Sequence, residues 1–274
     1  MSRHSVLAGA PLLIAHRGGS HLAPENTLAA FLNGVERWAA DMIELDVHAS
    51  ADGHCVVLHD ERVDRTTNGT GPVAAMTLAQ LRQLDAGYRF TRDGGATFPF
   101  RGTGVRIPTI EEVLEALPTV RMTVEVKAAA AQEPLFAAIR RFNARDRVIA
   151  AGMYDRDRSM FGTYDGALSG SLEELKPFWI RHRFGLGWLR RPDCDVVQIP
   201  EEWNDRRLVT KRFARDLRRH GIPLHVWTVN APADMHRLLD WGIEGLISDR
   251  PDVLGRVLHE RVGRPLAPAH RDSE

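Results

Sequence analysis

Cysteine is scarce in this chain of 274 residues, which contains only Cys55 and Cys194. Two cysteines cannot form a disulfide framework, so we expect two free, buried thiols in a reducing compartment. An excess of charge of one sign is also missing, because 36 lysine and arginine residues balance 36 aspartate and glutamate residues. Domains that bind nucleic acid through a broad basic surface are normally basic overall, so the sequence excludes this class.

No apolar run of the sequence is long enough to cross a bilayer. The run at residues 6–15 is interrupted by Pro11 and falls short of the roughly 20 residues of a membrane helix. No small-residue cleavage site follows it, so we interpret it as a strand of a cytoplasmic protein rather than as a secretory leader. The apolar content of 43% and the charged content of 26% are typical of a soluble globular chain.

Lysine is the third scarce residue, because only three of the 36 basic residues are lysine and the others are arginine. The three are Lys127, Lys176 and Lys211. Arginine replaces surface lysine at little cost, so a lysine that remains in such a chain is a candidate for a specific role.

Short apolar segments alternate with amphipathic segments along the chain. We expect strands at residues 12–16, 42–48, 55–59, 122–127, 148–152, 196–200, 224–229 and 246–249, with a weaker ninth at 165–170. We expect helices at residues 27–40, 109–117, 133–143, 211–220 and 232–241, and a short one near 78–84. Strands that are apolar on both faces indicate a parallel sheet covered by helices. About eight such units predict a (β/α)8 TIM-type barrel in one domain, residues 1–259.

Three segments depart from this alternation. The connection between residues 42–48 and 54–59 is too short for a parallel crossover and contains Asp52-Gly53, so these strands should form an antiparallel hairpin. Residues 60–108 are rich in turn residues and predict an insertion or lid. Residues 260–274 predict a flexible tail.

Glu44 and Asp46 lie two residues apart in an apolar strand, so both side chains face the same side. Residues 41–60 contain five acidic residues and no lysine or arginine. Carboxylates held together inside a barrel repel each other unless a cation lies between them, and a divalent cation with oxygen ligands meets that need. The alternative is a solvated edge strand.

Glu125 and Lys127 repeat this spacing with one acid and one base. A structural ion pair explains the pattern. The scarcity of lysine favours a second interpretation, in which the compact charge of Lys127 binds a phosphate oxygen.

His16 and His59 each end a predicted strand, at the edge where barrels build active sites. Two histidines can serve as a general acid and a general base. Arg17 next to His16 supplies a planar donor for an anion, and Gly18-Gly19 lets backbone approach a ligand. Trp227 ends a late strand, where it is either barrel core or a surface that packs on glycerol or a quaternary ammonium group.

With these residues in view, the sequence resembles the glycerophosphodiester phosphodiesterase family of phospholipase-C-like barrels. Nine matching segments occur in the family's order over about residues 12–255: His16-Arg17-Gly18, Ala23-Pro24-Glu25-Asn26-Thr27, Glu44-Leu45-Asp46-Val47, Val57-Leu58-His59-Asp60, Asp64-Arg65-Thr66-Thr67, Ile107-Pro108-Thr109, Glu125-Val126-Lys127, Trp227-Thr228-Val229-Asn230 and Gly245-Leu246-Ile247-Ser248-Asp249-Arg250-Pro251.

The resemblance implies hydrolysis of glycerophosphodiesters to glycerol 3-phosphate and an alcohol. It implies a divalent cation, Ca²⁺ or Mg²⁺, held by Glu44, Asp46 and Glu125. It makes His16 and His59 the acid/base pair and implies that Arg17 and Lys127 bind the phosphate, while a hydroxyl group of the substrate acts as the nucleophile. The expected partner is therefore a small phosphodiester and not a nucleic acid.

Two departures from the family pattern leave the substrate open. Ala151-Gly152-Met153-Tyr154 replaces a Ser-Phe pair that is common after the fifth strand. The aromatic segment at residues 88–100 is longer than in compact members, and an apolar lip there would admit an acyl chain, as in lysophospholipase D-like or sphingomyelinase D-like enzymes. A non-catalytic binder of phospho-headgroups is a third alternative, but it predicts the loss of a site residue and none is lost.

The segment at residues 181–220 carries 11 basic and 6 acidic residues. A solvated helix surface rich in arginine explains this excess, and peripheral contact with anionic lipid is the alternative.

Overall fold

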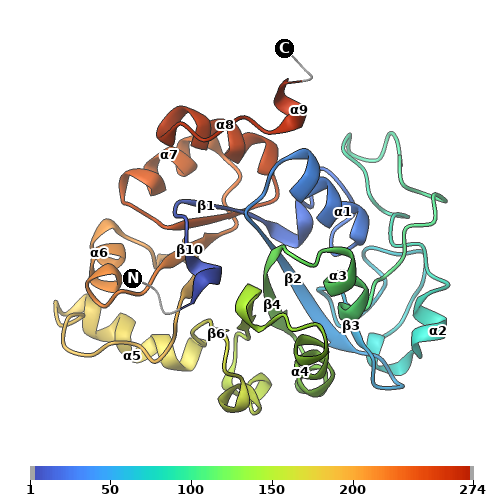
Figure 1. Ribbon diagram of the computed structural model, residues 1–274, viewed down its shortest axis with the longest axis horizontal. Coiled ribbons are helices and arrows are strands. Elements are labelled where there is room, and N and C mark those ends of the chain that lie inside the picture. Colours follow the sequence, from blue (N-terminus) through green and yellow to red (C-terminus); the bar gives the residue numbers. More distant parts are fainter. Residues whose placement is uncertain (1–3, 272–274) are drawn as a thin grey trace.

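Eight parallel strands form a ring at the centre of the computed structural model, which describes residues 4–271 (Figure 1). Their order around the ring is β6-β5-β4-β2-β1-β11-β10-β7. Their bounds are β1 Leu12–Ala15, β2 Met42–Ala49, β4 Arg121–Val126, β5 Val148–Ala151, β6 Ala167–Leu168, β7 Val197–Pro200, β10 Leu224–Trp227 and β11 Gly245–Ser248. A parallel bridge between Ser169 and Val196 joins the two ends of this order. The predicted α/β barrel is confirmed.

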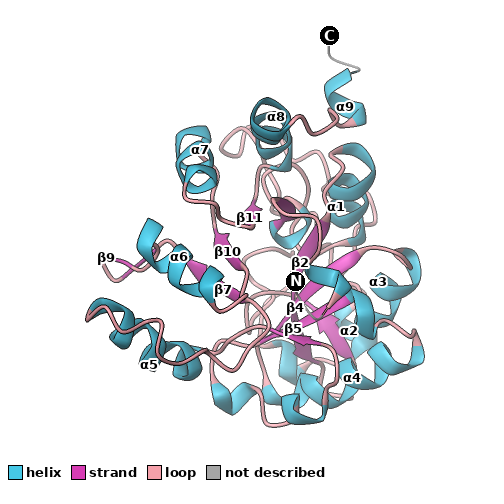
Figure 2. Ribbon diagram, turned by 60° about the vertical axis from the view of Figure 1, so that its left-hand side comes forward, coloured by secondary structure: helices cyan, strands magenta, loops and turns pink. Residues whose placement is uncertain are grey.

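Helices surround the strands, as Figure 2 shows. Their bounds are α1 Leu28–Leu32, which continues as a π-helical turn at Asn33–Arg37, α3 Ile110–Ala116, α4 Gln132–Arg141, α5 Leu172–Arg183, α6 Lys211–Arg219, α7 Pro232–Asp240 and α8 Pro251–Val262. Thr109 and Ser171 begin α3 and α5 with reciprocal capping boxes. The sequence patterns missed α5, which contains Pro177, and α8.

The predicted hairpin is present. β2 pairs with β3 (Cys55–Val57) in antiparallel register, with Val47 opposite Val57 and Ala49 opposite Cys55. The chain then passes His59 back alongside β2, where His48 Nε2 donates to the His59 carbonyl oxygen at 3.1 Å. The hairpin thereby brings His59 to the acidic face of β2.

A second hairpin was not predicted. β8 (Glu202–Trp203) and β9 (Arg206–Arg207) pair in antiparallel register. Asn204 and Asp205 join them with φ angles of 48° and 59°, a conformation that these two residue types tolerate better than most. An Asn-Asp pair between two-residue strands is too short a pattern to stand out in the sequence.

The segment at residues 60–108 adds no strand to the ring. It contains α2 (Leu78–Leu81), and its apolar residues form a small cluster with the hairpin: Val56, Leu58, Val63, Val73, Leu81, Ala86 and Ile107. Its aromatic residues contact each other, because the Phe90 and Phe100 rings meet edge to face at 5.3 Å. The Arg101 guanidinium stacks on Phe98 at 3.7 Å.

Part of the predicted tail is packed against the barrel. Arg264 donates to Asp41 Oδ1 at 3.0 Å, and α9 (Pro268–Arg271) buries His270, whose Nε2 donates to the Asp252 carbonyl oxygen at 2.8 Å. These polar contacts attach the segment through Arg271 to the barrel, and the flexibility of residues 260–274 stays a prediction. Residues 272–274 lie outside the described residues.

Both cysteines are buried and free, as predicted. Burial raises the pKa of the Cys194 thiol to about 12, so the thiol stays protonated. None of the helices in residues 4–271 has the length and apolar composition that crossing a membrane requires. The cytoplasmic location stays a prediction.

Gly18 lies where α1 packs closely against the end of β1, so replacing it tests this packing. Its φ is +87°, and an added Cβ would lie 2.8 Å from the backbone carbon of Ala30. We expect Gly18→Ala to lower the free energy of unfolding by more than Gly53→Ala, which is the matched control because Gly53 has a φ of +83° and open space around it. Gly53→Ala should cost only the strain of a left-handed alanine, about 1–2 kcal/mol. Denaturant titrations measure both, and equal losses would contradict the close packing.

Candidate active site

The structure brings all eight predicted site residues to one cavity of about 440 Å³. They are His16, Arg17, Glu44, Asp46, His59, Glu125, Lys127 and Trp227. Most lie at or just beyond the carboxyl end of a ring strand or after the β2–β3 hairpin. Glu44 and Asp46 stand within β2, in the part of that strand that extends past the end of β1. This is the end of a barrel at which active sites are built.

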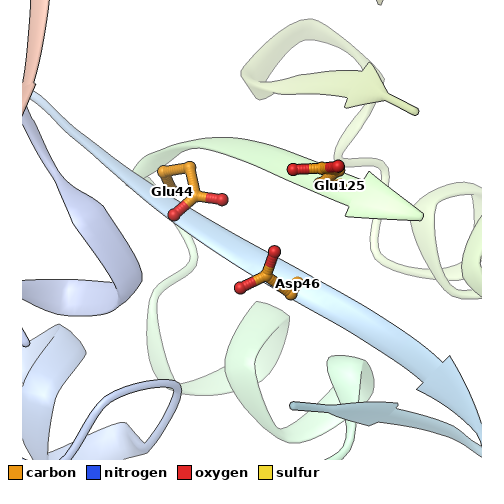
Figure 3. Close-up of side chains that lie close together, drawn as sticks. All are labelled: Glu44, Asp46 and Glu125. Atoms are coloured by element: carbon orange, nitrogen blue, oxygen red, sulfur yellow. The ribbon is translucent and has the colours of Figure 1, made fainter. Parts of the chain in front are cut away.

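Three carboxylates gather on the inner side of β2 and β4. Glu44 and Asp46 stand on β2, and Glu125 stands on β4 directly opposite Asp46 in the parallel register (Figure 3). One oxygen atom from each lies within 4.8 Å of the others. Glu44 and Asp46 are buried, which fixes them against the barrel wall. Oxygen donors at this spacing match the preference of Ca²⁺ and Mg²⁺.

The electrostatics of this group show a deficit of positive charge at Glu44. Burial, together with the neighbouring carboxylates of Asp46 and Glu125, raises the pKa of Glu44 to about 7. Burial also raises the pKa of Glu125. The pKa of Asp46 is lowered instead, because Lys127 and Arg17 outweigh the effect of its burial. A divalent cation next to Glu44 would relieve this deficit, so the donor set fits such an ion.

Lys127 lies between two of the carboxylates. Its Nζ is 3.1 Å from Asp46 Oδ1 and 3.0 Å from Glu125 Oε1. Burial lowers the pKa of Lys127, but these carboxylates raise it more, so the ammonium group stays charged. The ion pair interpretation of the Glu125 and Lys127 spacing is therefore correct. Lys127 also lines the cavity, and its contact with phosphate stays a prediction.

A left-handed turn after β1 positions Arg17. Its φ of 50° directs the backbone N–H to Glu44 Oε2 at 3.0 Å, and its guanidinium donates to Glu25 Oε1 at 2.8 Å. We predicted that Gly18-Gly19 lets backbone approach a ligand, but the structure gives another reason for these two glycines. An added Cβ on Gly18 would meet α1, and one on Gly19 would lie 2.9 Å from Pro251, so the glycines permit close packing of the protein itself.

His16 is held by a carboxylate. Its Nδ1 donates to Asp249 Oδ1 at 2.6 Å, while Nε2 lies 3.9 Å from Glu44 Oε2. Asp249 also accepts from Ser20 at 2.5 Å and from Asn230 at 2.7 Å. Burial lowers the pKa of His16, but the hydrogen bond to Asp249 and the charge of Glu44 raise it above the ordinary value. The contact fixes the ring and leaves Nε2 available.

His59, which follows the β2–β3 hairpin, is held by a carboxylate in the same way as His16. Its Nδ1 donates to Asp60 Oδ1 at 2.7 Å. Arg65 donates to Asp60 Oδ2 at 2.6 Å and to both oxygens of Glu25 at 2.7 Å. Glu25 also accepts from Arg17, so one network of charged groups orients His59 and Arg17 together.

Sequence reasoning assigned no role to Asp249 or Glu25, although both occur in the matching segments. Asp249 directly follows β11, the same position at a strand end that identified His16. Glu25 lies in a loop, and only its contacts to Arg17 and Arg65 reveal it.

The cavity also has an apolar wall. Its residues come from β5, α5, β7, the β8–β9 hairpin and α6, and they include Met153, Leu175, Trp179, Trp203, Leu208 and Phe213. Among the described residues, none of the segment at 88–100 lines the cavity. The condition for an apolar lip at this segment is therefore not met, because its aromatic side chains contact each other and Arg101 instead. Trp227 packs against the barrel core, as one interpretation predicted, and it also lines the cavity, while its contact with a substrate stays a prediction.

Comparisons with known proteins agree with this geometry. The sequence profile of the glycerophosphoryl diester phosphodiesterase family matches residues 16–253. A glycerophosphodiester phosphodiesterase of Caldanaerobacter subterraneus is 36% identical over 89% of this chain and 96% of its own length. A glycerophosphodiester phosphodiesterase of Bacillus subtilis is 30% identical over 90% of this chain and 86% of its own length.

Two solved structures share the fold. A glycerophosphoryl diester phosphodiesterase domain from Mycobacterium tuberculosis superposes with a TM-score of 0.81 at 22% identity, covering 92% of this chain and 100% of that domain. A phosphodiesterase of Oleispira antarctica, solved with the product sn-glycerol-3-phosphate, superposes with a TM-score of 0.73 at 23% identity, covering 92% and 98% of the two chains. The chain belongs to the glycerophosphoryl diester phosphodiesterase family and is a phosphodiester hydrolase.

Proposed function

We propose that this enzyme hydrolyses glycerophosphodiesters to glycerol 3-phosphate and an alcohol with the help of a divalent cation. The observation that carries the proposal is the meeting of three carboxylates, two carboxylate-bound histidines and two cationic side chains around one cavity. A non-catalytic binder would need no such acid/base pair. The product found in the Oleispira antarctica structure belongs to the same reaction.

Glu44, Asp46 and Glu125 would hold the cation, Ca²⁺ or Mg²⁺, which stabilises negative charge on the non-bridging oxygens of the phosphodiester when it is bound. Arg17 and Lys127 supply fixed positive charge for the same oxygens. Their carboxylate partners keep them oriented before substrate arrives, so little reorganisation accompanies the reaction.

His16 and His59 move the protons. One imidazole removes the proton from a hydroxyl group of the glycerol unit, which attacks phosphorus and forms a cyclic phosphate. The other imidazole donates a proton to the departing alcohol oxygen, and water then opens the ring with the two roles exchanged. Both rings use Nδ1 for a carboxylate, so Nε2 is the atom that exchanges protons with the substrate in this proposal.

Product identity tests the reaction directly. Purified enzyme incubated with glycerophosphocholine should release glycerol 3-phosphate and choline in equal amounts, which enzymatic or NMR assays detect. Release of glycerol and phosphocholine would place the cleaved bond on the other side of phosphorus and would overturn the proposal.

A second candidate function rests on the apolar wall. Leu175, Trp179 and Trp203 give the cavity an apolar lining that a deacylated headgroup does not need. An acyl chain would bury this surface, so hydrolysis of a lysophospholipid or related acylated headgroup is the alternative substrate class.

Replacing Trp203 distinguishes between the two substrate classes. We expect Trp203→Ala to lower kcat/KM about tenfold or more for a short-chain lysophosphatidylcholine below its micellar concentration, since it removes apolar contact with the acyl chain. It should leave kcat/KM for glycerophosphocholine within about twofold. Phe98→Ala is the matched control, because Phe98 lies in the expected lip but outside the cavity wall. Equal effects of Trp203→Ala on both substrates would count against an acyl site.

A further inference from the structure

A loop after α5 exposes large apolar side chains to solvent. In this apolar loop, residues 184–189, Phe184 is 79% exposed, Trp188 is 59% exposed and Leu189 is 53% exposed. Leu186 and the nearby Ile180 on α5 are also exposed. Single exposed apolar residues are ordinary, but several adjacent ones that include Trp and Phe mark an interaction surface.

The backbone of the apolar loop is anchored beneath these side chains. The Gly187 carbonyl oxygen accepts from His220 Nε2 at 2.8 Å, and the Leu186 N–H donates to the Arg181 carbonyl oxygen at 2.9 Å. An added Cβ on Gly187 would lie 2.9 Å from Asp216 Oδ2, so the loop rests directly on α6. The exposed side chains are thus presented by a fixed support.

Basic residues flank the apolar loop on both sides. They are Arg181 and Arg183 on α5, and Arg190 and Arg191 after the loop. Within residues 4–271, no carboxylate lies within 4.0 Å of their charged nitrogen atoms. The nearby Glu174 is engaged by Arg158 at 2.8 Å. These arginines therefore form no ion pair within residues 4–271, and Arg191 donates to the Cys194 carbonyl oxygen at 3.1 Å.

We propose that residues 180–191 form a peripheral docking surface for an anionic lipid bilayer. Aromatic and aliphatic side chains enter the boundary between headgroups and acyl chains, while the arginines bind the anionic headgroups. Each basic residue near an anionic surface adds to the affinity for the bilayer. A loop with an apolar tip and arginines on both sides has this complementarity.

A second copy of the chain fits the surface less well. A symmetric dimer would bring the same patch of both copies together, and with it Arg190 and Arg191 of each copy. Centres of homodimer interfaces are depleted in charge, so bringing the arginines of two copies together disfavours a dimer through this patch. Charge complementarity therefore favours the bilayer.

Docking would also place the apolar wall near lipid. Helix α5 carries Leu175 and Trp179 toward the cavity and Ile180 toward solvent. The Arg183 guanidinium lies over the Trp179 ring at 5.4 Å, which joins the basic flank to the cavity wall. Figures 1 and 2 both show α5 at the periphery of the barrel.

Vesicle binding tests the docking surface. Wild-type enzyme should co-sediment with vesicles of phosphatidylcholine and phosphatidylglycerol, and much less with phosphatidylcholine alone. Arg190→Ala with Arg191→Ala should lower the partition coefficient about tenfold or more, and Phe184→Ser with Trp188→Ser should abolish binding. Val262→Ser is the matched control, because Val262 is 55% exposed on α8 outside the surface. All variants should hydrolyse soluble glycerophosphocholine at the wild-type rate.

Fluorescence gives a second readout that does not depend on the serine variants folding. Lipids brominated on the acyl chain should quench part of the tryptophan fluorescence of the wild-type enzyme, and Trp188→Phe should remove that part. Equal binding to neutral and anionic vesicles, or quenching unchanged in Trp188→Phe, would overturn the proposal. So would a concentration-dependent dimer that Phe184→Ser with Trp188→Ser dissociates.

Discussion

Replacing His16 with alanine is expected to lower kcat for glycerophosphocholine by about 100- to 10,000-fold, the contribution of one general acid or base. The side chain lines the cavity, and its Nδ1 is committed to Asp249, so Nε2 is the group that is lost. Steady-state release of choline measures the effect.

His54→Ala is the control for this experiment, because His54 is an exposed histidine in the turn of the β2–β3 hairpin, away from the cavity. It should keep wild-type activity. A folded His16→Ala enzyme with wild-type kcat would contradict the acid/base role.

Replacing Asp249 tests the same site through the pH dependence of activity. Its hydrogen bond helps to raise the pKa of His16, so Asp249→Asn should lower that pKa. The limb of the kcat/KM pH profile that reports His16 should then move toward lower pH. A drop in activity with an unchanged profile would indicate a structural role only.

The catalytic face of this barrel could be predicted from the sequence because it depends on local rules. Glu44 and Asp46 share a face through strand alternation, and His16 lies at a strand end. The Asp52-Gly53 turn predicted the hairpin that brings His59 to them. These relations involve residues close together in the chain.

The contacts that orient the site could not be predicted in this way. Asp249 meets His16 across 233 positions, because β1 and β11 are neighbours only in the closed ring. The apolar wall likewise joins Trp179 on α5 to Trp203 in a hairpin of two-residue strands. The segment at 88–100 has the composition of such a wall, but its side chains contact each other instead.

Glu44→Gln and Asp46→Asn should have opposite effects on stability while both abolish metal-dependent activity. The pKa of Glu44 is about 7 in the folded protein against an ordinary 4.5, so the metal-free protein loses stability as pH rises through this range. Above it the penalty is complete, and Glu44→Gln should raise the free energy of unfolding by about 1–3 kcal/mol.

Asp46→Asn should instead lower the free energy of unfolding. The folded-state pKa of Asp46 is lowered, so its carboxylate stabilises the protein above its ordinary pKa, and that stability is lost as pH falls through the lowered value. Its replacement leaves Lys127 and Arg17 short of a buried partner, which should cost about 3–5 kcal/mol. Denaturant titrations of the metal-free proteins at about pH 8 measure both signs. Destabilisation by Glu44→Gln would contradict the charge deficit at Glu44.

The most direct test of the metal site is restoration of activity in enzyme stripped with EDTA. Wild-type enzyme should lose hydrolysis of glycerophosphocholine on stripping and recover it when Ca²⁺ or Mg²⁺ is added, whereas Glu44→Gln and Glu125→Gln should recover little at the same metal concentration. Full activity of the stripped wild-type enzyme, or full recovery of both variants, would contradict a catalytic cation held by Glu44, Asp46 and Glu125.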